Sequence, residues 1–262
     1  MSFFLDYALL GVVAGILAGL LGVGGGIVIV PALYFLYHLQ GLPDPLIMHL
    51  AVGSSLMTVI FTSISSTLAH HRRGAVLWPA ALWLAPGIVI GALLGAGLAD
   101  LLPESILRRS FAVFECYVAL QMMLGLKPRP SRNLPRAPVL SLIGGGIGMI
   151  SSMLGIGGGT LTVPFLIWCN VNIRNAVATS AACGLPIATA GASGFLLTGW
   201  GRPELPPWSS GYIYWPAVLG VVITSALFAP LGARLAHAIP VDTLKRVFAV
   251  VLLIIGGRML YG

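Results

Sequence analysis

Apolar residues occur along this chain in long runs that are separated by short polar or Pro-rich links. A helix needs about 20 apolar residues to cross a hydrocarbon core about 30 Å thick, and most of the runs approach or exceed that length. They predict helical segments at residues 5–21, 25–39, 46–70, 75–99, 105–126, 138–154, 158–170, 175–199, 211–237 and 243–262. The pattern therefore predicts an all-α polytopic membrane protein.

The second half of the chain repeats the first. Residues 21–31 read LGVGGGIVIVP and residues 154–164 read LGIGGGTLTVP, in the same place within each half. Two unrelated helical bundles would share hydrophobicity but not such identities, so an internal duplication is the better interpretation. We predict a first repeat at 1–126 and a second at 138–262, joined by a basic, Pro-rich linker at 127–137.

Each repeat begins with two short runs that are split by glycines, at 22–26 in the first repeat and at 155–159 in the second. We expect each pair to form a helix-break-helix hairpin, at residues 5–39 and 138–170, with its tip inside the membrane. The free backbone groups of such a tip must line a protein-walled or watery cavity. Because five segments is an odd number, we expect two inverted repeats, inserted upside down relative to each other.

Composition agrees with a membrane location, since 58% of the residues are hydrophobic, 8% are charged and the mean hydropathy is +0.98. The formal net charge is +7. Its basic residues are spread over short links and form no long stripe interleaved with aromatic residues, as a nucleic-acid interface would. We therefore predict the lipid bilayer as the partner of this surface, and no nucleic acid.

The basic residues also predict an orientation. If each glycine break is the tip of a hairpin, one side of the membrane holds Arg72, Arg73, Lys127, Arg129, Arg132, Arg136, Arg174, Arg234, Lys245 and Arg246. The other side holds Arg108, Arg109, Arg202 and Arg258. The positive-inside rule then makes the linker 127–137 cytoplasmic and puts both termini outside. If each broken segment instead crosses once, the basic residues divide almost evenly and leave the orientation undefined.

The strongest candidate chemistry lies in the glycine breaks. Consecutive glycines can turn with positive φ and leave backbone N–H groups uncovered, and the helix that follows adds the partial positive charge of its N-terminus. Such a cradle favours an oxyanion. We predict substrate-binding residues at Gly24, Gly25, Gly26, Gly157, Gly158, Gly159 and Thr160. The alternative is close helix packing, which explains the four-residue spacing of Gly87, Gly91 and Gly95 well.

A matched pair of hydroxyl residues follows each hairpin. Residues 51–55 read AVGSS and residues 176–180 read AVATS, and both stretches lie early in their predicted helices. Hydroxyls can donate to an anion without adding a fixed charge that would trap it. We predict that the substrate also contacts Ser54, Ser55, Thr179 and Ser180. Hydroxyls farther along the first of these helices, such as Thr58 and Thr62, are expected to bond carbonyl groups of their own helix.

Few ionisable residues fall inside the predicted spans. Glu115 lies in the middle of one, where a carboxyl is a candidate for proton coupling, with a structural glutamate as the alternative. His49 is a second candidate for proton coupling, or else a residue of the membrane interface. Cys116, Cys169 and Cys183 lie in apolar runs without the spacing of metal ligands. We therefore expect no metal site and no cofactor.

One motif points to a different class of protein. Gly191-Ala-Ser-Gly194 is similar to the nucleophile motif of rhomboid intramembrane proteases and would make Ser193 catalytic. The only later histidine is His237, at the end of a predicted helix, and no pairing of the two is evident. No Walker loop or dinucleotide fingerprint occurs. We therefore expect no catalytic residues, and a membrane-embedded serine hydrolase remains the alternative from another class.

Several of these motifs together resemble a known family. Residues 22–31 and 155–164, the hydroxyl-containing stretches that follow them, and His71 before Arg-Arg-Gly74 are similar to the sulfite exporter TauE/SafE family, also described as toluene sulfonate uptake permeases. The resemblance covers essentially the whole chain. It implies a multi-pass permease of the bacterial inner membrane that moves sulfite, thiosulfate, organosulfonates or related small anions, with protons as the coupling ion. A carrier of carboxylates or of a metal cation is the main alternative.

Overall fold

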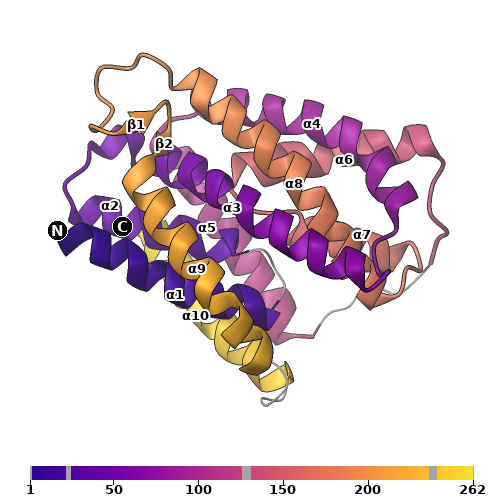
Figure 1. The fold of residues 1–262 in the computed structure, drawn as a ribbon. Coiled ribbons are helices and arrows are strands. Elements are labelled where there is room, and N and C mark those ends of the chain that lie inside the picture. Colours follow the sequence, from indigo (N-terminus) through magenta and orange to yellow (C-terminus); the bar gives the residue numbers. More distant parts are fainter. Residues whose placement is uncertain (1, 22–24, 126–130, 236–240, 262) are drawn as a thin grey trace.

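The computed structural model describes residues 2–21, 25–125, 131–235 and 241–261. In these ranges the chain forms a bundle of α-helices with one short antiparallel hairpin at its edge (Figure 1). The helices are α1 (Ser2–Leu21), α2 (Gly26–Leu39), α3 (Ile47–Arg72), α4 (Trp78–Leu101), α5 (Glu104–Met123), α6 (Ala137–Met153), α7 (Gly159–Trp168), α8 (Ile173–Thr198), α9 (Trp215–Leu235) and α10 (Val241–Tyr261). A 3₁₀ turn at Asp44–Leu46 precedes α3, and β1 (Ser209–Ser210) pairs with β2 (Ile213–Tyr214). The prediction of an all-α membrane-type fold is confirmed.

The prediction that a helix starts at residue 211 is wrong. Residues 209–214 form the β-hairpin, and α9 begins only at Trp215. Trp208 and Gly211 have φ angles of 69° and 54°, which a continuous right-handed helix does not accommodate. The stretch is apolar enough for a helix, but its turn conformation selects a hairpin.

Three of the described helical segments are long and apolar enough to cross a bilayer, namely Asp44–Arg72, Trp78–Leu101 and Ile173–Thr198. Shorter apolar helices accompany them, including α2 and α7, which have 14 and 10 residues. Large apolar side chains such as Leu82 and Ile90 of α4 stay exposed on the outside of the bundle. A surface of this kind fits lipid rather than water.

The main packing surfaces lie between the two halves of the sequence. α1 packs along α9 and α4 packs along α6, while α3 packs on α8 and α5 packs on α10. In Figure 1, α4, α6 and α8 lie together on one side of the bundle, and α1 and α9 lie together on the other. Each of these pairs joins a helix that precedes the linker to a helix that follows it.

Glycines make the closest helix pairs possible. A methyl group on Gly91 of α4 would overlap the backbone carbonyl of Gly145 on α6, and Gly87 and Gly95 meet α6 in the same way. Glycines of α1 make an equally close contact with α9. Small residues allow membrane helices to approach this closely, so the packing role expected for the evenly spaced α4 glycines is confirmed.

The links between helices gather at two ends of the bundle. One end, the hairpin end, holds the α2–α3, α4–α5 and α8–α9 links, which line one cavity. The opposite end, the linker end, holds the α3–α4 and α7–α8 links and the chain that leads into α6. The start of α1 and the end of α10 both lie at the hairpin end, since Tyr7 bonds Gln40 and Arg108 bonds Met259.

We predict that Gly91→Val separates α4 from α6 and lowers the free energy of unfolding by about 1–3 kcal/mol, because the new side chain overlaps the backbone of Gly145. Gly97→Ala on the same helix is the matched control, since nothing lies within 4 Å of its added methyl group. Thermal unfolding of the purified protein in detergent compares the two variants. Equal unfolding temperatures would contradict this account of the packing.

Candidate functional site

The two glycine breaks lie against each other in the interior of the bundle. A methyl group on Gly26 would lie 2.7 Å from the carbonyl oxygen of Gly155, 3.0 Å from Cα of Ile156 and 3.3 Å from the amide nitrogen of Gly157. Only glycine allows one backbone to approach another in this way. Gly24, a member of the predicted cradle, lies outside the described residues. The described parts of the two breaks are therefore neighbours, as a shared site requires.

At the first break, Gly25 turns the chain into α2. Its φ of 74° is left-handed, and its carbonyl oxygen accepts the N–H groups of Val28 and Ile29, each at 3.0 Å. No side chain caps the helix, and its first turn holds no acidic residue. The N–H groups at the start of α2 therefore precede the first intrahelical hydrogen bond and stay uncapped beside the second break.

At the second break, Gly155 ends α6 in a Schellman motif with a φ of 69°. Its N–H group bonds the carbonyl of Ser152 at 3.1 Å, and the N–H group of Ile156 bonds the carbonyl of Ser151 at 3.0 Å. The carbonyl groups at the end of α6 are thus satisfied by the turn itself, and glycine supplies the left-handed conformation that this turn needs.

α7 then starts at Gly159 without a side-chain cap and without an acidic residue in its first turn. The N–H group of Thr162 bonds the carbonyl of Gly158 at 2.8 Å, and the N–H groups before it have no intrahelical acceptor. The hydroxyls of Thr160 and Thr162 have no hydrogen-bond partner in the part of the chain that the structure describes, and Thr162 is fully buried. Buried polar groups of this kind are suited to a polar ligand.

Two of the four predicted hydroxyl residues lie at the second break. Ser55 on α3 donates its hydroxyl hydrogen to the carbonyl oxygen of Gly155 at 2.8 Å. Ser180 on α8 lies beside Gly158, where an added methyl group would be 3.1 Å from the carbonyl oxygen of Ser180. Both serines are buried, so α3 and α8 enclose the break from two sides.

The other two hydroxyl residues connect each half of the chain to a helix start in the other half. Ser54 Oγ accepts the backbone N–H group of Tyr214 at 3.0 Å, and Thr179 Oγ1 accepts that of Leu77 at 3.0 Å. In the alignment of the two halves, Ser54 corresponds to Thr179 and Leu77 to Tyr214, so the same bond occurs twice. Each hydroxyl still has its own hydrogen to donate, and its contact with a substrate stays a prediction.

Hydroxyls farther along α3 bond their own helix. Thr58 Oγ1 donates to the carbonyl of Ser55 at 2.7 Å, and Thr62 Oγ1 donates to that of Val59 at 3.1 Å. The expectation for Thr58 and Thr62 is confirmed. Each of these two hydroxyls thus satisfies a carbonyl group of its own helix, α3.

The two candidates for proton coupling lie on α5 and α3. Glu115 on α5 is fully buried against α10, with Oε2 3.5 Å from where a methyl group on Gly256 would lie. Neither of its oxygens has a hydrogen-bond partner among the residues that the structure describes. His49 lies near the start of α3, with Nε2 3.0 Å from the carbonyl oxygen of Ala99. Since a carbonyl only accepts, Nε2 carries the hydrogen of that bond.

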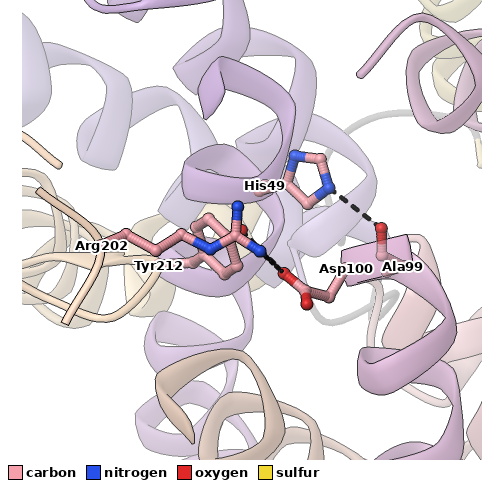
Figure 2. Close-up of polar contacts among 5 residues, drawn as sticks. All are labelled: His49, Ala99, Asp100, Arg202 and Tyr212. Carbon is pink, nitrogen blue, oxygen red and sulfur yellow. Dashed lines mark hydrogen bonds and ion pairs between the residues drawn. The ribbon is translucent and has the colours of Figure 1, made fainter. Parts of the chain in front are cut away.

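A polar cluster at the hairpin end is a functional candidate that the sequence did not reveal. Asp100 Oδ1 lies 2.7 Å from Arg202 Nη2 and accepts the Tyr212 hydroxyl at 2.8 Å (Figure 2). Burial raises the pKa of the Tyr212 phenol, and the hydrogen bond to Asp100 raises it further, so the phenol stays a donor. In the sequence, Asp100 and Arg202 are single charged residues that each follow a predicted span. Nothing in the sequence indicates that they pair.

Side chains for other chemistry are placed differently. Ser193, the nucleophile of the alternative protease, is exposed on the outside of α8, and His237 lies outside the described residues. In the described ranges, no three His, Cys, Asp or Glu side chains gather as a metal site would need. The polar groups described at the glycine breaks are backbone amides, carbonyls and hydroxyls.

Long apolar helices surround a helix start that meets a second glycine break among buried hydroxyls, an arrangement typical of membrane transporters with interrupted helices. The chain matches the family described as "Sulfite exporter TauE/SafE" over residues 7–259, and it belongs to this family.

Relatives from distant microorganisms cover almost the whole chain. A Haemophilus influenzae protein named "Probable membrane transporter protein" is 40% identical over 259 residues, which is 98% of each chain. The "Probable membrane transporter protein YunE" of Bacillus subtilis is 28% identical and covers 98% of this chain and 97% of its own. The "Probable membrane transporter protein MJ0441" of Methanocaldococcus jannaschii is 28% identical, with 96% and 93% covered. No solved structure matches the chain significantly.

We predict that Gly26→Ala forces the two breaks apart and lowers the free energy of unfolding by about 1–3 kcal/mol, because its methyl group would lie 2.7 Å from a backbone oxygen. Gly146→Ala is the control, since that position is exposed on α6 and nothing lies within 4 Å of the added methyl group. Thermal unfolding in detergent measures both variants. A Gly26→Ala protein as stable as the control would argue against the contact between the breaks.

Proposed function

We propose that this protein is a secondary transporter of small sulfur-containing anions such as sulfite, thiosulfate or organosulfonates. The observation that carries the proposal is the contact of Gly26 with Gly155 and Gly157, because it brings the uncapped start of α2 next to the break that precedes α7. Membership of the family supports transport. The substrate class rests on the family's description and on the chemistry of the cradle.

An anion suits this cradle because N–H groups at two helix starts are uncapped there. The carbonyl oxygens of Gly25, Gly155 and Gly158 each accept a hydrogen bond from the protein, whereas the N–H groups at both helix starts are uncapped. Uncapped N–H groups at a helix N-terminus attract negative charge. We assign the substrate site to Gly24, Gly25, Gly26, Gly157, Gly158, Gly159, Thr160, Ser55 and Ser180, with Ser54 and Thr179 at its edges.

The helix pairs support an inverted repeat. When α1–α5 are matched in order with α6–α10, the α1–α9 pair corresponds to the α6–α4 pair. The α3–α8 and α5–α10 pairs each correspond to themselves. A pseudo-twofold axis through the bundle produces this pattern, and transporters built this way alternate access by rocking one unit against another around a central site. We further propose an inner-membrane location with the linker 127–137 cytoplasmic and both termini outside.

Protons are the proposed coupling ion, with Glu115 as the principal carrier and His49 as a second candidate. A fully buried carboxyl without a partner among the described residues is a typical position for a group that takes up and releases a proton during transport. A carrier of carboxylates is the second candidate function, since the cradle binds oxygen atoms and does not distinguish sulfur from carbon behind them. Exposure of Ser193 disfavours a serine hydrolase.

We predict that the protein in proteoliposomes takes up labelled sulfite, thiosulfate or a small sulfonate. Gly158→Val should lower the uptake rate about tenfold or more, because a loss of anion contacts worth about 1.4 kcal/mol corresponds to a factor of ten. A side chain at Gly158 meets Ser180, whereas Gly146→Val points away from the bundle and serves as the control. Uptake of carboxylates alone would favour the second candidate function. Unchanged uptake in both Gly158→Val and Gly25→Val would exclude the amide cradle as the substrate site.

We predict that Glu115→Gln abolishes the stimulation of uptake by a pH gradient but leaves exchange of substrate across the membrane intact. The amide keeps the shape of the side chain and cannot carry a proton. Uptake is measured with and without an imposed pH gradient, and Glu204→Gln in the exposed α8–α9 link is the matched control. Full stimulation in Glu115→Gln would remove Glu115 from the coupling mechanism.

A further inference from the structure

A cavity of about 450 Å³ opens at the hairpin end of the bundle. We call it the vestibule, and its walls include Asp44, His49, Asp100, Glu104, Arg202 and Tyr212. None of the described residues of the glycine breaks is among its walls. It is therefore a separate space, and its charged lining differs from the neutral amides and hydroxyls of the substrate site.

Two of the three acids in the vestibule have basic neighbours away from Arg202. Asp44 Oδ1 lies 3.5 Å from His38 Nδ1, and Glu104 Oε1 lies 3.6 Å from Arg108 Nε. The Arg108 guanidinium offsets the negative charge of Glu104. The guanidinium of Arg202 is the basic group in its wall, and an anion in the vestibule meets it there.

The third acid, Asp100, holds Arg202 and Tyr212 together, and we call these three residues the latch. One carboxylate oxygen of Asp100 accepts both Arg202 at 2.7 Å and the Tyr212 hydroxyl at 2.8 Å (Figure 2). The guanidinium also lies 5.3 Å above the Tyr212 ring. The Arg202 side chain is 39% exposed, whereas that of Asp100 is 19% exposed. A solute can therefore reach Arg202 while the latch is closed.

The latch joins the α8–α9 link, which includes the β-hairpin, to the end of α4, and the hairpin itself packs on α3. Tyr212 is fully buried, and its ring stacks on His49 with the centroids 5.1 Å apart. Tyr214, at the end of β2, donates its N–H group to Ser54. The next residue of α3, Ser55, bonds the second glycine break. The hairpin thus follows α3 from the vestibule to the edge of the substrate site.

Among the residues that the structure describes, the latch is found at the hairpin end and not at the linker end. The α3–α4 link at the linker end spans residues 73–77 and shares the backbone-to-hydroxyl bond, between Leu77 and Thr179. The α8–α9 link spans residues 199–214 and adds Arg202 and the hairpin to the same arrangement. The added residues have no counterpart in the first half, so the duplication alone does not account for them.

We propose that the vestibule is a docking site for small oxyanions, in which the anion replaces Asp100 on the guanidinium of Arg202 and so loosens the α8–α9 link, which includes the β-hairpin, from α4. The proposal rests on the proposed transport function. A guanidinium binds a carboxylate and a sulfonate through the same planar pair of N–H groups, so Arg202 stays satisfied during the exchange. Asp100 is left with Tyr212 alone, so the α8–α9 link keeps only one of the two hydrogen bonds that the latch makes to α4.

The test measures access to the substrate site directly. The full-length protein carries Ser55→Cys as a reporter beneath the hairpin, with the three native cysteines replaced by alanine, and is reconstituted in vesicles. A membrane-impermeant methanethiosulfonate is applied separately to each face. Methanesulfonate is the probe anion because it does not react with the reagent, and chloride is the control anion. We expect methanesulfonate, applied at the hairpin end, to speed labelling about fivefold, the effect of removing one partly exposed ion pair.

Variants of Arg202 separate anion docking from a structural role. Arg202→Gln should label about fivefold faster without any anion, since the latch is broken, and should no longer respond to methanesulfonate. Arg202→Lys keeps the charge without the planar fork and should retain a weaker response. Arg109→Gln, at an exposed arginine of α5, should behave like the parent. If a variant folds poorly, the docking site is still tested by comparing the labelling rate of the parent protein in methanesulfonate with that in chloride.

Labelling in the parent that ignores methanesulfonate, or a response that survives Arg202→Gln, would overturn the docking site. Uptake of labelled methanesulfonate by the protein with native Ser55 is measured in parallel. Uptake without an anion-dependent change in labelling would leave transport standing and remove the vestibule proposal alone. Anion-dependent labelling without uptake of any tested substrate would support the vestibule proposal and contradict the proposed transport function.

Discussion

Every peptide group in a hydrocarbon core needs a partner inside the protein, because no water is present to replace it. In this protein the helices meet that requirement almost everywhere, and the two glycine breaks are where it is relaxed. The carbonyl groups of Gly25, Gly155 and Gly158 accept hydrogen bonds within the protein, whereas the N–H groups at the starts of α2 and α7 have no side-chain cap. Uncapped N–H groups at helix N-termini favour a negatively charged ligand.

The duplication in the sequence explains how two such breaks come to share one place. Each break is covered by a helix of its own half and by the backbone of the other break, so neither half encloses a site alone. The paired bonds of Ser54 and Thr179 fasten the third helix of each half to a helix start in the other. Packing and the proposed function therefore depend on the same contacts between the halves.

Much of this architecture is readable from the sequence, because apolar runs and glycine triplets act locally. The interrupted helices, the packing of Gly91 and the position of Ser55 follow from spacing alone. The β-hairpin does not, since an apolar stretch gives no warning that Trp208 and Gly211 turn with positive φ. The pairing of Asp100 with Arg202 spans 102 positions and depends on tertiary structure. Interactions between links that are far apart in the chain cannot be predicted from a single sequence.

The glycine contacts of α4 with α6, and of α1 with α9, have a consequence for how the molecule moves. Two helices whose backbones touch cannot slide or separate without losing that fit, so we expect each pair to stay together during transport. Each pair takes one helix from each half of the sequence. If the two pairs move relative to each other, the rigid units of the protein are therefore not the two sequence repeats.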